Sequence, residues 1–159
     1  MKRILLTLLL SASICVGFAQ KTPSKAIGWD IAVSPGVALS RYYGSSSKFV
    51  LGAETRIQQN FGYNFAWMAS FGYTHFSALE NGYFSLKGGI KAYLEPKVYL
   101  GAEIGIGEYS QGGEAFIFSP SVGMLFGKRW DLALKYESFS EFNFPDSQLA
   151  LRIGFKLSK

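Results

Sequence analysis

The feature that most constrains this chain is a strict alternation between large apolar residues and small or polar ones. Between residues 29 and 41 the even positions carry aspartate, alanine, serine and glycine, and the odd positions carry Trp29, Ile31, Val33, Pro35, Val37 and Leu39. A period of two is typical of a β-strand, because successive side chains point to opposite faces of a sheet. This segment is therefore predicted to be a strand with one bulky apolar face.

The same pattern recurs along the chain and predicts eight strands. Their ranges are 29–41, 49–58, 63–76, 83–94, 98–109, 116–126, 130–137 and 149–157. Tight turns at 60–62, 95–97 and 128–129 alternate with longer, more polar connections at 42–47, 77–82, 110–114 and 139–147. This alternation favours an all-β fold, an eight-stranded antiparallel transmembrane up-and-down β-barrel with both chain ends beside the short turns.

The distribution of bulk and charge indicates which face of the barrel points outward. The apolar face carries all three tryptophans and many phenylalanines, too much volume for the interior of eight strands. Mid-strand charges fall on the opposite, small-residue face, as insertion into hydrocarbon requires. After residue 20 no run of about 18 apolar residues predicts a membrane helix. A soluble periplasmic ligand-binding barrel, which would place its apolar face inside, is the alternative.

The N-terminus has the pattern of an export signal. Lys2 and Arg3 precede an apolar run at residues 4–16, and Gly17 and Ala19 supply small residues before a cleavage point. We predict a signal peptide at 1–19, a short periplasmic segment at 20–28 and the barrel at 29–159. The only cysteine, Cys15, lies in the signal. Export through the Sec pathway and residence in a Gram-negative type of outer membrane follow.

The inward face carries charges of both signs in similar number. By parity these are Asp30, Glu54, Arg56, Lys87, Lys91, Glu103, Asp131, Lys135, Glu137, Arg152 and Lys156. Buried charges need partners, so we predict a paired polar network that fills the lumen of a monomeric barrel. The net charge of +5 is spread along the chain, which argues against a nucleic-acid partner. One histidine and no cysteine after the signal predict neither a metal site nor a cofactor.

Over residues 29–157 the chain resembles the small outer-membrane β-barrel domain family, with OmpA-barrel and OmpX-like architecture. The Ser-Pro-x-Val segments at Ser34–Val37 and Ser119–Val122 resemble strands that recur in such barrels. The resemblance implies passage through the barrel-assembly machinery. We predict a structural, adhesive or surface-interaction role without catalysis, and contact with lipopolysaccharide follows from the predicted location. Pro35 and Pro120 lack an N–H for the ladder, so we expect a bulge at each.

An enzymatic alternative depends on a short pattern. Some eight-stranded outer-membrane barrels act on lipid A, and one deacylase family uses a His-x-Ser pair with a nearby acid. This chain has His75, Ser77 and Glu80 near a predicted outer loop. Spacing of two places His75 and Ser77 on one strand face, where the histidine would act as the base for the serine. The alternative is a lipid-A-modifying hydrolase.

Overall fold

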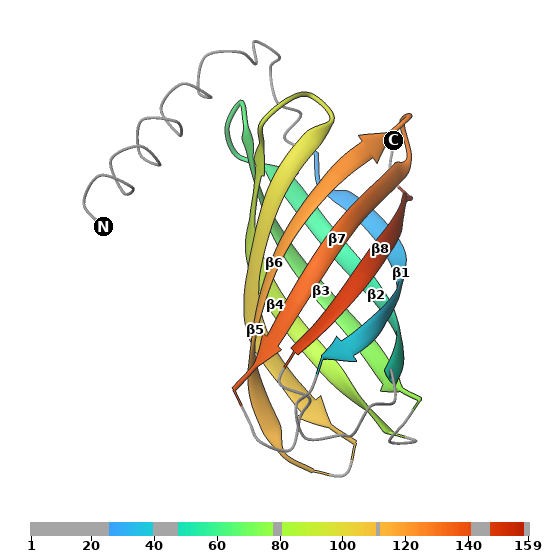
Figure 1. Ribbon diagram of the computed structural model, residues 1–159. Coiled ribbons are helices and arrows are strands. Elements are labelled where there is room, and N and C mark those ends of the chain that lie inside the picture. The colour runs from blue at the N-terminus through green and yellow to red at the C-terminus, as the bar shows by residue number, and fades with distance from the viewer. Residues whose placement is uncertain (1–25, 40–47, 78–80, 111, 141–146, 158–159) are drawn as a thin grey trace, which may run out of the picture.

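The fold is a closed barrel of eight antiparallel strands (Figure 1). The computed structural model describes residues 26–39, 48–77, 81–110, 112–140 and 147–157. Within these, no helix is long and apolar enough to cross a membrane. The predicted signal peptide at 1–19 lies outside the described residues, as does Glu80. The strands are β1 Gly28–Leu39, β2 Lys48–Asn60, β3 Phe65–Phe76, β4 Asn81–Tyr93, β5 Val98–Tyr109, β6 Glu114–Phe126, β7 Trp130–Phe139 and β8 Ser147–Lys156.

The predicted fold class is confirmed, with small differences at the strand ends. β5 has its predicted bounds, whereas β3 begins two residues late because residues 61–64 form the turn, which the amide of Phe61 closes by donating to the carbonyl of Phe65. The start of β1 and the end of β8 lie at the same end of the barrel as the β2–β3, β4–β5 and β6–β7 turns (Figure 1). We call this the turn end.

The opposite end, the loop end, carries two longer connections, at 40–47 and 140–146. The predicted longer connections at 77–82 and 110–114 are corrected: they are reduced to 77–80 and 110–113, as short as the turns, because β4 and β6 begin earlier than predicted.

The strands are staggered as they pass around the barrel. Following paired residues from Trp29 through every strand leads back to β1 at Leu39, ten residues further on. The successive partners are Trp29, Ile57, Ala69, Gly88, Ile104, Phe118, Ser138, Ser147 and Leu39. With ordinary strand spacings, this stagger gives a tilt of about 40° and a backbone radius of about 8 Å. A barrel this narrow has room inside for side chains but not for a wide channel.

Two prolines lie inside strands without shifting them. The residues on both sides of Pro35 keep one register with β8, and those around Pro120 keep one register with β7. A bulge would add a residue to one strand and change the register, so the predicted bulges are wrong. Each proline instead interrupts one ladder, because it has no N–H to donate. The ladder on its other side, to β2 or to β5, continues unbroken.

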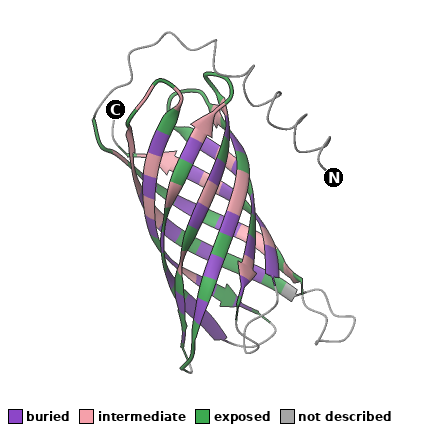
Figure 2. Ribbon diagram, turned by 90° about the vertical axis from the view of Figure 1, so that its left-hand side faces the viewer, coloured by how far each residue is buried: buried purple, intermediate pink, exposed green. Residues whose placement is uncertain are grey.

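The two faces of the barrel differ as the sequence predicts (Figure 2). Large apolar side chains on the outside remain about half exposed, for example Leu86 at 57%, Ile104 at 55% and Ile106 at 58%. Trp29, Tyr63 and Trp130 lie on this outer surface at the turn end, and Phe84 and Phe116 lie on it toward the loop end. An apolar exterior around a polar interior is the arrangement of a transmembrane barrel. It is the reverse of the soluble ligand-binding barrel considered above.

Candidate functional site

The interior of the barrel is a charged network, and the structure places ten predicted lumen residues in it. Each is at most 9% exposed. Five are acidic and five basic, so their formal charges cancel. The residues are Asp30, Glu54, Glu103, Asp131 and Glu137, with Arg56, Lys87, Lys91, Lys135 and Arg152. The eleventh, Lys156, is partly exposed at the turn end and makes no ion pair with the described residues.

Glu54 is the central acceptor of this network. Its carboxylate accepts hydrogen bonds from Arg56 Nη2 at 3.2 Å, Lys135 Nζ at 3.1 Å and Arg152 Nε at 2.5 Å. Lys87 Nζ lies 3.8 Å from the same carboxylate. Four cations from β2, β4, β7 and β8 thus converge on one anion of β2, which joins opposite sides of the barrel.

Toward the loop end the network continues through Glu137. This carboxylate accepts hydrogen bonds from Lys87 Nζ at 2.5 Å, from Tyr83 Oη at 2.9 Å and from Gln148 Nε2. Lys135 Nζ lies 3.4 Å away and connects Glu137 to Glu54. The polar network therefore extends through Glu137 to Tyr83, near the loop end.

Toward the turn end the acceptors are Asp131 and Asp30. Asp131 accepts from Lys91 Nζ at 3.0 Å and from the hydroxyl of Tyr99, and it lies 3.6 Å from Arg152 Nη1. The Lys91 ammonium also sits 3.9 Å from the centre of the Tyr99 ring. Asp30 accepts from Arg152 Nη2. Arg152 therefore links three carboxylates at different heights in the barrel.

Glu103 completes the network on the β5 side. It accepts from Arg56 Nη2 at 2.8 Å and from Ser70 Oγ at 2.8 Å. Like Lys91, Asp131 and Glu137, it is completely buried. Charges removed from water to this extent are tolerated only when paired. The network therefore fixes the side chains of the lumen and occupies its cross-section.

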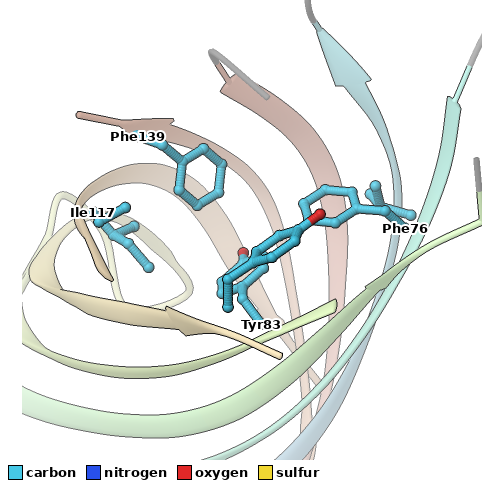
Figure 3. Close-up of a cluster of buried hydrophobic side chains, with 7 residues drawn as sticks. Phe76, Tyr83, Ile117 and Phe139 are labelled. Carbon is cyan, nitrogen blue, oxygen red and sulfur yellow. The ribbon is translucent and has the colours of Figure 1, made fainter. Parts of the chain in front are cut away.

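An apolar plug closes the lumen at the loop end. It consists of Val50, Phe76, Tyr83, Tyr109, Ala115, Ile117 and Phe139. Figure 3 shows four of them, from four strands, turned toward the interior. The Tyr83 ring packs edge-on against Phe139 with centroids 5.3 Å apart, and stacks near Phe76 at 5.6 Å. Tyr83 also donates to Glu137 and so joins the plug to the charged network.

This plug was not predicted from the sequence, although its residues carry a signal. Phe76, Tyr83, Ile117 and Phe139 occupy inward positions by the same parity that placed the charges. A lumen-facing apolar residue near the end of one strand carries little information by itself. The cluster becomes visible only when the register places four strand ends at one height.

The proposed hydrolase residues are not assembled in the described part of the chain. His75 and Ser77 lie on one face of the chain, as their spacing predicts, but that face is the exposed exterior. The Ser77 hydroxyl donates to the carbonyl of Phe49 at 2.7 Å, and among the described residues it makes no hydrogen bond to His75. Nor do those residues include a group of three or more His, Cys, Asp or Glu side chains suited to a metal ion.

Comparison with known proteins finds likeness in structure alone. No family model matches the chain, and no curated protein matches its sequence. A de novo designed transmembrane β-barrel aligns with a TM-score of 0.60 at 11% identity, over 88% of this chain and 100% of the design. Ail of Yersinia pestis, the attachment invasion locus protein, solved with the heparin analogue sucrose octasulfate, aligns at 0.57 and 15% identity, over 82% of this chain and 97% of Ail.

Neisserial surface protein A is a third similar structure. It aligns with a TM-score of 0.59 at 11% identity, over 86% of this chain and all of that chain. At such identities the likeness establishes a shared fold, that of small eight-stranded transmembrane barrels.

Proposed function

We propose that this chain is a small barrel of a Gram-negative type of outer membrane, with a structural, adhesive or surface-interaction role and no catalysis. The observation that carries the proposal is an apolar, lipid-facing exterior around a charge-balanced and filled interior. Within the described residues, the plug and the charged network occupy the lumen and leave little room for a solute. Function is therefore assigned to the surface and not to transport.

Surface interaction is favoured over a purely structural role by the arrangement of the connections. The two longest join β1 to β2 and β7 to β8, and the strand ends that they join are at the loop end. The loop end faces outward when the chain ends are periplasmic. Connections that project from a rigid scaffold are where binding residues concentrate. Ail, similar in fold, was solved with a heparin analogue, which makes sulfated polysaccharide a suitable first ligand to test.

Further parts of the proposal concern location and partners. The barrel is exported by the Sec pathway after removal of residues 1–19, is inserted by the barrel-assembly machinery, contacts lipopolysaccharide and acts as a monomer. A closer kinship with OmpA-barrel and OmpX-like proteins belongs to the same proposal. No specific observation favours the lipid-A hydrolase, since His75 and Ser77 do not interact.

The test has two stages in a Gram-negative host. First, the isolated outer membrane is washed with carbonate, and unboiled and boiled samples are compared by gel mobility. A faster unboiled band retained in the washed membrane is expected of an inserted closed barrel, and release by carbonate would refute the location.

The second stage measures adhesion of the expressing cells to immobilised heparin. Replacing loop-end residues 40–47 and 141–146 with short Gly-Asn turns is expected to abolish adhesion. The control replaces the turn-end residues Lys128 and Arg129, which face the periplasm in this proposal, and is expected to leave adhesion unchanged. Equal adhesion by all variants and by cells lacking the barrel would contradict this role.

A further inference from the structure

An apolar groove of about 600 Å³ lies on the outer surface and crosses β8, β1, β2 and β3. It runs between two rows of residues paired across the strands. One row is Trp130, Phe155, Ile31, Thr55 and Phe71, and the other is Ile153, Val33, Ala53 and Tyr73. The groove is open because the outward-facing side chains of β2 in it are only Ala53 and Thr55, where the other strands contribute larger ones.

The floor of the groove explains its depth. Between the two outward rows runs an inward-facing row that includes Ala32, Glu54 and Gly72, which also line the groove. Their side chains point into the barrel or are absent, so their backbone forms the floor. The depression therefore reaches the sheet itself at the middle of the barrel.

One end of the groove reaches the turn end, where its character changes. Trp130 and Phe155 line it there, with ring centroids 5.1 Å apart. The Arg129 guanidinium lies 5.7 Å from the centre of the Phe155 ring, and Arg129 is exposed. Tryptophan and arginine beside an apolar surface are characteristic of the level of lipid headgroups. The Arg129 guanidinium thus lies at the turn end of a groove whose other surface is almost entirely apolar.

We propose that this groove is a binding site for an anionic glycerophospholipid of the periplasmic leaflet. An acyl chain lies in the groove over Ala53 and Thr55, and the phosphate contacts Arg129. The shape supplies the place for a chain, and the guanidinium supplies charge complementarity, since Arg pairs well with phosphate. The inference rests on the proposed membrane location, which places the turn end in the periplasmic leaflet.

The experiment uses Trp130 as the reporter within the site. The chain has three tryptophans, so replacing Trp29 and Trp67 with phenylalanine leaves Trp130 alone. This variant is reconstituted in phosphatidylcholine vesicles that contain a small fraction of phosphatidylglycerol brominated on its acyl chains. Bromine near the groove quenches Trp130 fluorescence. We expect stronger quenching than random mixing predicts, and stronger than with brominated phosphatidylcholine.

Two variants and two matched controls identify the site. Ala53→Phe fills the groove and is expected to reduce quenching to the random-mixing value, whereas Ala102→Phe, on the outer face of β5, is not. Arg129→Gln is expected to lower the preference for phosphatidylglycerol by roughly two- to fivefold, the contribution of one cation near an anionic lipid. Lys97→Gln, at another turn of the same end, is expected to leave that preference unchanged.

Three results would overturn the proposal. The first is quenching at the random-mixing value in the chain that has Trp130 as its single tryptophan. The second is quenching that Ala53→Phe does not change. The third is a dimer that is detected by cross-linking and that Ala53→Phe abolishes. The last result would assign the groove to a second copy of the chain. Each reconstituted sample is also checked for heat-modifiable mobility, so that failure to insert, which contradicts the proposed function, is distinguished from an inserted barrel without a lipid site.

Discussion

Replacement of Arg152 by methionine tests whether the lumen network stabilises the barrel. The guanidinium contacts Glu54, Asp30 and Asp131. Without it, Glu54 retains Arg56 and Lys135, and Asp131 retains Lys91. Asp30 makes its ion pair in the described residues with Arg152 alone, so one carboxylate is left buried and uncompensated.

The expected cost follows from that one orphaned charge. Removing one partner of a buried pair costs about 3–5 kcal/mol. With a urea dependence of about 2 kcal/mol per molar, the unfolding midpoint falls by about 1.5–2.5 M. The assay is urea unfolding in lipid vesicles, followed by tryptophan fluorescence and gel mobility. Lys128→Met, at an exposed turn, is the control and should change stability by no more than about 0.5 kcal/mol.

A second variant separates the charge effect from a packing defect. Adding Asp30→Asn to Arg152→Met removes the orphaned carboxylate and is expected to restore at least about half of the lost stability, by the logic of a double-mutant cycle. If Arg152→Met behaves like the control, or if Asp30→Asn restores nothing, the reasoning from uncompensated charge is refuted.

Three further predictions concern packing and chemistry. Gly89→Ala should destabilise the barrel strongly, because a Cβ there would overlap the carbonyl oxygen of Ala102. Gly88→Ala, with nothing nearer than 4.0 Å, should be tolerated, and the urea midpoints of the two variants compare them directly. Phe139→Ala should lower the free energy of unfolding by about 3–5 kcal/mol through the cavity left in the plug. Planar-bilayer recording should show whether the variant conducts ions, with the non-conducting unsubstituted barrel as the control. His75→Ala should leave the mass spectrum of lipid A from expressing cells unchanged, and a new acylation pattern would instead support the hydrolase.

The sequence predicts the strands and their faces well, for a physical reason. Side-chain alternation is a local property, so the opposite faces of Ile104 and Glu103 can be predicted from the residues next to them in the sequence. The same local rule correctly places His75 and Ser77 on one face. The bulge predicted at Pro35 from its missing N–H was wrong, because a missing donor can interrupt one ladder without changing the register.

The partners inside the lumen could not be predicted in this way. Parity tells which residues point inward but not their height along the axis, and that height depends on the stagger of ten residues accumulated around all eight strands. Only with this stagger does Arg152 of β8 reach Asp30 of β1 and Asp131 of β7 together. The plug and the outer groove also depend on register, so they too became apparent only in the structure.

The sequence separation of the ion pairs has a consequence for how the barrel assembles. Glu54 and Lys135 are 81 positions apart, Glu54 and Arg152 are 98 apart, and Asp30 and Arg152 are 122 apart. In a hairpin or a partly assembled sheet, some of these charged side chains are therefore still without their partners, and they must stay hydrated. Contacts between such distant segments form slowly, because a long chain must first be ordered. Closure of β1 on β8 becomes the committing step of assembly, after which release of the barrel requires many pairs to break at once.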